Sequence, residues 1–249
     1  MEQTIIPTSG VPASADSMRI QERFAIFLAL IAGYIDATGL IKWKTYVSFM
    51  SGNTTQLGPA LAKGNSEIIL TSITAIASFV IGVYAGTCLS FWKRNLWKSL
   101  PFFIVSGLLA FYTSFTFYHT INVGQSIGII AFSMGIMNTI VTSVGNQKVN
   151  TDFVTGTLNS LARNTAVWSM TTNEIDRKMS KSSSILLLLL WVGFLSGATG
   201  ATFLFPLLAN WTLVLPASLL LFSSVIIPTQ LLNTKPLVKQ NNYVTKTSG

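Results

Sequence analysis

Residues 51–56, with the sequence Ser-Gly-Asn-Thr-Thr-Gln, form a polar cluster inside a strongly apolar part of the chain. A shorter version of this cluster, Thr-Gly-Thr, recurs at residues 155–157. Hydroxyl and amide groups beside membrane-length apolar segments are costly to bury unless they find hydrogen-bond partners or line water. The two clusters therefore indicate places where something polar is handled by ligands that carry no fixed charge.

Asp36 is the strongest single candidate, because it lies well inside the first long apolar segment, residues 24–41. An ionised carboxylate at the centre of a membrane helix costs about 2.5–3.5 kcal/mol on insertion scales, so it is a functional hypothesis by default. Asp36 could be protonated in coupled transport or bind a cation. The structural alternative is a position nearer the external end, with a hydrogen bond to Thr38 or pairing with Lys42 or Lys44.

The glycines of the two clusters, Gly52 and Gly156, allow tight bends and close backbone approach. If helices begin near Ser51 and Thr155, their first N–H groups would be open to an anion or a carbonyl group. The structural alternative is that small and hydroxyl residues only let membrane helices pack closely. The repetition of the cluster favours function, whereas glycines 82, 86, 193, 197 and 200 are assigned to helix packing.

The amino-acid composition indicates whether most of the chain is surrounded by water or by lipid. Half of the 249 residues are apolar and only 10% are charged, whereas globular domains carry about a quarter charged residues. The net charge of +8 comes from basic residues at the ends of apolar runs, and no basic stripe interleaved with aromatics indicates nucleic-acid binding. We therefore expect a protein embedded in the lipid bilayer, with no nucleic-acid partner.

Residue types that support covalent or metal chemistry are sparse. Cys88 and His119 are each the only residue of their type, which excludes a disulfide framework and a metal site built from thiols or histidines. Paired intramembrane carboxylates and a nucleophile elbow are also missing from the sequence. We therefore expect no enzyme activity, no cofactor and no metal.

Six apolar segments are suited to cross the hydrocarbon core, which takes about 20 helical residues. They cover residues 24–41, 68–92, 100–119, 123–144, 184–205 and 211–228. Two further segments are apolar at their edges and polar in the middle, as expected of re-entrant or broken helices, and cover residues 46–62 and 153–168. The expected fold is an all-α polytopic membrane bundle with six transmembrane helices and two re-entrant segments. The expected organisation is a disordered lead at 1–20, one integral domain at 21–229 and a polar tail at 230–249.

The basic residues orient these segments. If both re-entrant segments return to the side they left, 13 of the 16 Lys and Arg residues are cytoplasmic, and Lys42, Lys44 and Lys63 lie outside. Eight crossings would reduce this split to 10 and 6. A seven-span alternative, in which residues 46–62 cross and the N-terminus lies outside, also gives 13 and 3. Six and seven spans both place the C-terminus in the cytoplasm.

An internal repeat favours six spans. Three pairs of blocks align in order, namely 33–36 with 135–138, 47–57 with 151–161, and 82–86 with 193–197. Asp36 then corresponds to Asn138, which is uncharged. Two repeats of three spans each, at about residues 21–119 and 120–229, would be inserted in opposite orientations, as in many transporters and channels.

Four ordered motifs also carry a resemblance to a known family. They begin at Gly33, Tyr46, Met134 and Val154 and read GYIDA, YVSFMSGNT, MGIMN and VTGTL. Over residues 23–228 the chain resembles the YoaK-type family of bacterial multi-pass membrane proteins, in which Thr usually stands in place of Ser51. The resemblance implies a domain of unknown function in the bacterial cell (inner) membrane and names no substrate.

Two functions of different class are open at this point. The first is a transporter or channel for a small solute, with a path lined by the two polar segments. The second is a non-transporting membrane scaffold or interaction protein, in which these segments are only structural. Duplicated, broken and polar segments favour the first, and a chain this hydrophobic could also form homo-oligomers. The candidate path residues are Asp36, Ser51, Gly52, Asn53, Thr54, Asn138, Thr155, Gly156 and Thr157.

Overall fold

A computed structural model describes residues 15–91, 100–140, 143–144, 147–148 and 154–226 of the chain. These residues are almost entirely helical, and the two-residue strands β1 (Ser143–Val144) and β2 (Gln147–Lys148) pair antiparallel. The helices are α1 (Ala15–Trp43), α2 (Met50–Lys63), α3 (Ser66–Phe91), α4 (Leu100–Tyr118), α5 (Val123–Met137), α6 (Val154–Met170), α7 (Glu174–Leu208) and α8 (Val214–Ile226), with a short 3-10 turn, η2 (Ala209–Trp211), between the last two.

The helix ends follow from local sequence signals. Asn122 and Asn173 cap α5 and α7 with side chains that accept hydrogen bonds from the N–H groups of Gln125 and Ile175. Gly64 ends α2 in the left-handed region, with φ of 67°, which glycine adopts without a Cβ penalty. The turn at Gly64 sends α3 back along α2, so that the two helices form a hairpin.

Four helical stretches in the described part of the chain are long and apolar enough to cross a membrane. They are Met18–Trp43, Ser66–Phe91, Leu100–Tyr118 and Glu174–Trp211, and two shorter apolar helices cover Val123–Met137 and Val214–Ser224. The first stretch is central, because 67% of its most apolar window is buried inside the protein, whereas α3 buries only 22%. The exposed apolar side chains of α3, α4, α7 and α8 are therefore suited to contact lipid.

Two boundaries differ from those expected. The helix expected at 123–144 ends at Met137, because Asn138 caps it and the Thr139 hydroxyl donates to the Ile136 carbonyl at 2.7 Å. The expected disordered lead is also too long, since α1 begins at Ala15. The first residues of α1 include Arg19, Gln21 and other good helix formers, which extend the apolar helix at its N-terminal end.

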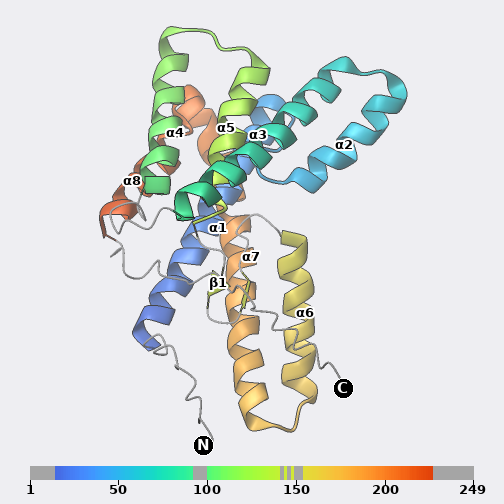
Figure 1. The fold of residues 1–249 in the computed structure, drawn as a ribbon, viewed down its shortest axis with the longest axis vertical. Helices are drawn as coiled ribbons and strands as arrows, with labels where there is room; N and C mark the ends of the chain where they lie inside the picture. The colour runs from blue at the N-terminus through green and yellow to red at the C-terminus, as the bar shows by residue number, and fades with distance from the viewer. Residues whose placement is uncertain (1–14, 92–99, 141–142, 145–146, 149–153, 227–249) are drawn as a thin grey trace, which may run out of the picture.

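The helices pack in pairs that are far apart in the sequence. Helix α1 packs mainly on α7, α3 mainly on α5, and α4 on α8, while α2 lies on α3 and α6 on α7 (Figure 1). The core between them is formed by buried side chains of α1, α4, α5, α7 and α8, among them Leu28, Ile31, Ile35, Phe102, Leu109, Ile127, Ile130, Met134, Leu187 and Leu220.

Glycines bring the backbones of α1 and α7 into direct contact. A Cβ atom added at Gly33 would overlap the carbonyl of Phe194, and one added at Gly197 would overlap the carbonyl of Leu30. Such contacts require glycine, as the sequence predicts for packing positions. Gly200 is different, because nothing lies within 4 Å of a Cβ built there. The assignment of Gly200 to helix packing was therefore wrong, since it lies on an open face of α7.

The same kind of contact joins α3 and α5. A Cβ added at Gly82 would overlap the carbonyl of Phe132, and one added at Gly135 would overlap the carbonyl of Phe79. Gly193 lies against Ile26 and Gly197 against Leu30, while Gly128 lies near Thr74 and Ile136 lies near Gly86. In each pair of helices these contacting residue numbers rise together, so that α1 runs parallel to α7 and α3 runs parallel to α5. Parallel neighbours cannot be joined by a short turn, which explains why each pair combines helices from distant parts of the sequence.

Candidate functional site

Asp36 is buried near the end of α1 and holds the connection between α1 and α2. Its side chain is only 4% exposed, and its Oδ1 atom accepts hydrogen bonds from the backbone N–H groups of Val47, at 2.8 Å, and Ser48, at 2.9 Å. Asp36 lies about two turns, or about 10 Å, before the end of α1 at Trp43. The connection therefore folds back along α1, and α2 begins at a level inside the bundle.

Hydrogen-bond donors and a helix terminus surround this carboxylate. Helix α2 begins at Met50, directly after the two N–H groups that Asp36 binds, so the carboxylate lies beside the positive end of the helix dipole. Thr38, which was the alternative partner, instead donates its hydroxyl to the Tyr34 carbonyl at 2.9 Å. Asp36 thus acts as a distant N-terminal cap for α2, and the Ser48 hydroxyl is buried beside it.

Asn53 and Gly52 shape the turn that precedes α2. Asn53 is fully buried and makes a two-way contact with Tyr46, donating to its carbonyl at 2.7 Å and accepting from its N–H at 3.1 Å. A Cβ at Gly52 would lie 2.5 Å from the ring of Phe49 and 2.9 Å from the ring of Tyr46. These two candidate path residues therefore have a structural role in the turn.

The other residues of the first cluster face outward. Ser51, Thr54 and Thr55 are exposed on the first turns of α2. The hydroxyl of Thr54 donates to the carbonyl of Met50 at 2.8 Å, and that of Thr55 donates to the carbonyl of Ser51 at 2.9 Å. Because these hydroxyls bond only to their own helix, they leave their oxygen lone pairs toward the exterior.

The second cluster occupies the first turn of α6. Thr155 is exposed there, while Gly156 and Thr157 are half-buried. Further along the helix, the hydroxyl of Thr165 contacts the Ser184 hydroxyl of α7 at 3.4 Å. Asn138, the counterpart of Asp36 in the sequence, ends α5, and its Oδ1 atom is buried without a hydrogen-bond partner. Asn138 therefore does not form the cap that Asp36 forms.

The structure unites some of the candidate residues and separates others. The Asp36 carboxylate lies at the beginning of α2, and the sequence alone did not predict this position. The two clusters lie on different helix hairpins, one formed by α2 and α3 and the other by α6 and α7. In Figure 1 both α2 and α6 begin near the middle of the view and run away from it, α2 to the upper right and α6 downward.

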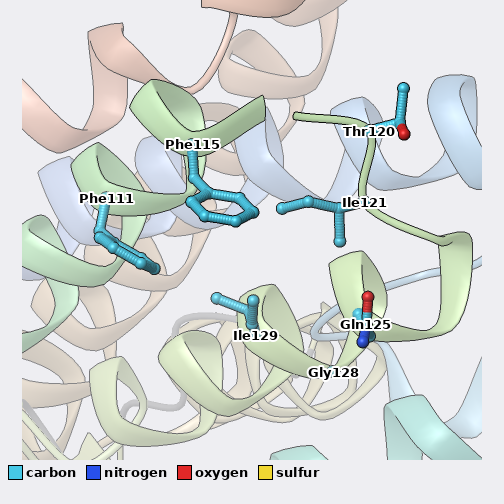
Figure 2. A pocket seen from close by; sticks show the side chains of 7 residues that line it. All are labelled: Phe111, Phe115, Thr120, Ile121, Gln125, Gly128 and Ile129. Carbon is cyan, nitrogen blue, oxygen red and sulfur yellow. The ribbon is translucent and has the colours of Figure 1, made fainter. Parts of the chain in front are cut away.

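Two hollows contain none of the candidate residues. One, of about 430 Å³, lies between α4 and α5, and Figure 2 shows the rings of Phe111 and Phe115 facing Ile121 and Ile129, with Gln125 at one side. The other, of about 550 Å³, is more apolar and is lined by Ala85, Cys88, Leu89, Phe91, Ile104, Phe132 and Ile136. The sequence signal for the first hollow is the spacing of Phe111 and Phe115 by one helical turn. That spacing does not identify a pocket, because any lipid-facing helix can show it.

Apolar helices of membrane-spanning length, packed through glycine contacts, define a polytopic α-helical membrane protein. The chain belongs to the family described as "Protein of unknown function (DUF1275)", which matches residues 24–226. This finding confirms the resemblance that the four sequence motifs carry.

Two relatives of the chain are named as transmembrane proteins of bacteria. The UPF0700 transmembrane protein YoaK of Bacillus subtilis (strain 168) is 30% identical over 145 residues, which are 54% of this chain and 62% of YoaK. The UPF0700 transmembrane protein RA0705 of Rhizobium meliloti (strain 1021) is 31% identical over 175 residues, which are 69% of this chain and 70% of the relative. The chain thus spans less than two thirds of the length of YoaK. No solved structure matches the chain.

Proposed function

We propose that the protein is a transporter or channel for a small solute, and that the first turns of α2 and α6 line its path. The observation that carries this proposal is the depth at which two helices with exposed hydroxyl groups begin. In this proposal the protein catalyses no covalent reaction and needs no cofactor.

The depth of α2 follows from its hairpin with α3. Helix α2 has 14 residues and ends at the turn that precedes Ser66, the first residue of the apolar helix α3. At 1.5 Å per residue, α2 begins about 21 Å from that turn. Since the hydrocarbon core is about 30 Å thick, Ser51 and Thr54 come to lie near its middle.

The depth of α6 follows from its contact with α7. Thr165 of α6 lies level with Ser184 of α7, where the polar beginning of α7 gives way to a run of leucines. From Thr165 back to Val154 the helix extends about 16 Å, which reaches the middle of the core from the other side. Thr155 is exposed at this depth.

Exposed hydroxyl groups at the middle of a membrane favour a wet path. The protons of Thr54 and Thr55 are bound within α2, but hydrocarbon offers the free lone pairs of these oxygens no donor. Polar and irregular segments at this depth are tolerated where they are buried in protein or line a water-filled cavity. Discontinuous helices that meet near the midplane from opposite sides are typical of transporters. The non-transporting scaffold remains the competing function, and in it these hydroxyls would be covered by a partner.

We further propose six spans arranged as two inverted repeats. The contact between Gly33 and Phe194 is matched by the contact between Gly135 and Phe79 if α1 corresponds to α5 and α7 corresponds to α3. The two contacts involve the same residue types, a glycine against a phenylalanine backbone. The apolar helices α1, α3, α4, α5, α7 and α8 would then be the six spans, in the inner membrane of a bacterium.

The same correspondence reproduces a second contact. Under this correspondence, the contact between Gly197 and Leu30 in one pair of helices is equivalent to the contact between Gly82 and Phe132 in the other. Gly82 therefore corresponds to Gly197. The sequence blocks pair Gly82 with Gly193 instead, which lies one helical turn earlier in α7. Agreement between two independent glycine contacts supports a common plan for the two halves.

The test is solute flux into liposomes that contain the purified protein. Ser51→Trp and Thr155→Trp place a large side chain at the proposed path, and Thr87→Trp places one on an exposed position of α3. We expect flux to fall at least about tenfold in the first two variants, as for a block worth about 1.4 kcal/mol or more, and to persist in the third. Equal flux in all three folded variants, or no flux for any class of solute, would overturn the proposal.

A further inference from the structure

We infer that the solute of the proposed path is a small uncharged molecule rich in hydrogen-bond donors, of the polyol type. The inference rests on the proposed function and concerns the chemistry of the first turns of α2. It follows from which donors and acceptors of this segment are already used inside the protein.

The beginning of α2 has little to offer an anion. A helix N-terminus normally presents free N–H groups to negative charge. Here the N–H groups of Val47 and Ser48 are bound by Asp36, and that of Tyr46 is bound by Asn53. The chain's own carboxylate thus occupies the position that an anionic solute would need.

The next N–H groups are used by backbone carbonyls. The N–H of Met50 donates to the carbonyl of Ser48 at 2.9 Å. Those of Gly52 and Asn53 donate to the carbonyl of Phe49 at 3.1 and 3.3 Å. Most donors at this end of the helix are therefore satisfied within the chain, and an anion would have to displace existing hydrogen bonds.

The exposed hydroxyls present acceptors. A threonine hydroxyl has one proton and two lone pairs, and the protons of Thr54 and Thr55 are both directed to carbonyls of α2. The amide of Asn164 on α6 behaves in the same way, because its Nδ2 atom donates to the carbonyl of Ser160 at 2.8 Å and leaves Oδ1 as the free acceptor. The first turns of α2, and the more distant Asn164 of α6, therefore present acceptors to a solute that donates hydrogen bonds.

Charge at the proposed outer side disfavours a cation. Lys42 and Lys63 lie in the last turns of α1 and α2, and Lys44 follows α1 directly. Asp36 is buried among its own backbone donors, and Glu67 in the first turn of α3 is the acidic residue that follows Lys63. A surplus of positive charge lowers the local concentration of cations. An uncharged solute rich in hydrogen-bond donors is affected neither by the lack of free N–H groups, which disfavours an anion, nor by the positive charge, which disfavours a cation.

The experiment compares four probes in the same proteoliposomes, namely glycerol, erythritol, methylammonium and formate. We expect glycerol and erythritol to enter at least about ten times faster than into protein-free liposomes, and the two ions to show no increase. Faster entry of methylammonium or formate than of the polyols would leave the path in place and overturn the inferred class. If none of the four enters, the inferred class is refuted, whereas the path is refuted only if no class of solute enters.

A residue-level arm uses threonines with the same local hydrogen bond. Thr54→Val and Thr55→Val remove outward acceptors, whereas Thr54→Ser keeps one. Thr87 on α3 is exposed and bonds its own helix at 2.7 Å, so Thr87→Val is the matched control. We expect polyol flux to fall about fivefold with each valine on α2, as for one lost hydrogen bond, to fall less in Thr54→Ser than in Thr54→Val, and to be unchanged in Thr87→Val. Unchanged flux in Thr54→Val and Thr55→Val would overturn the inference.

Discussion

At the scale of single residues, Asp36 shows why a charged residue inside an apolar helix is ambiguous. The sequence suggested a protonation or cation site, and the structure gives the carboxylate two backbone N–H partners at the beginning of α2. Hydrogen bonds to a charged group contribute about 1.5–3 kcal/mol, which is comparable to the cost of placing the charge there. Stabilisation of the fold is therefore a sufficient reason for a charge at this position.

Two substitutions at Asp36 distinguish the contribution of its hydrogen bonds to stability from the contribution of its charge. Asp36→Asn keeps an oxygen that can accept from Val47 and Ser48, so we expect a loss of about 1–2 kcal/mol of stability from the missing charge. Asp36→Ala leaves two buried N–H groups without an acceptor, at about 1–3 kcal/mol each, and should be much less stable. Thermal unfolding in detergent measures the difference. Equal unfolding temperatures for the two variants would show that the two hydrogen bonds do not hold the connection.

Gly52 and Gly58 form a matched pair on α2. A Cβ at Gly52 would press on the rings of Tyr46 and Phe49, and we expect Gly52→Ala to destabilise the protein by about 1–3 kcal/mol. Nothing lies within 4 Å of a Cβ at Gly58, so Gly58→Ala should stabilise it by about 0.5–1 kcal/mol through helix propensity. The unfolding temperatures of the two variants should move in opposite directions from that of the natural sequence, and a shift of both in the same direction would contradict the expectation.

At the scale of elements, the helices divide into a scaffold and two polar hairpin arms. The scaffold consists of the parallel pairs α1 with α7 and α3 with α5, held by glycine contacts that leave no room for a side chain. The arms α2 and α6 have 14 and 17 residues and carry exposed hydroxyls on their first turns. A rigid scaffold that carries polar arms suits a protein in which only the arms meet solute.

The glycines of α7 test the scaffold directly. Gly197→Ala would drive a Cβ into the backbone of Leu30, which cannot move without separating α1 from α7, so we expect a loss of about 3 kcal/mol. Gly200→Ala, on the open face of the same helix, should be neutral or stabilising by up to about 1 kcal/mol. Yield of folded protein and unfolding temperature in detergent report both effects. Similar behaviour of the two variants would argue against the close pairing of these helices.

At the scale of the whole molecule, the sequence predicted the apolar helices better than their partners. Hydropathy located the four long and two shorter apolar helices of the described residues, because a lipid environment imposes a length and a composition on a spanning helix. The polar segments were placed at 46–62 and 153–168, close to α2 and α6. The capping role of Asp36 could not be predicted, because it depends on a connection that folds back along α1. In the proposed repeat, the one-turn difference between Gly193 and Gly197 also rests on helix contacts that hydropathy does not reveal.

The positions of the chain ends test the topology of the whole molecule. With six spans both ends lie in the cytoplasm, whereas the seven-span alternative places the N-terminus outside. We expect accessibility tags at Met1 and Gly249 to be labelled only after the membrane is opened. Labelling of an N-terminal tag in intact cells would refute the six-span arrangement and the inverted repeat with it, while a C-terminal tag serves as the reference.

The pairing of α1 with α7 has a consequence for biosynthesis. A ribosome makes α1 first, yet the glycine surface of α1 stays without its partner until α7 has been inserted, with all of α2 to α6 made in between. The same holds in shorter form for α3, which waits for α5. An N-terminal fragment that stops before α7 would therefore enter the membrane with an uncovered glycine face, exposed to quality-control proteases. The two parts of the chain, expressed as separate polypeptides, should accumulate only when both are present in the same cell.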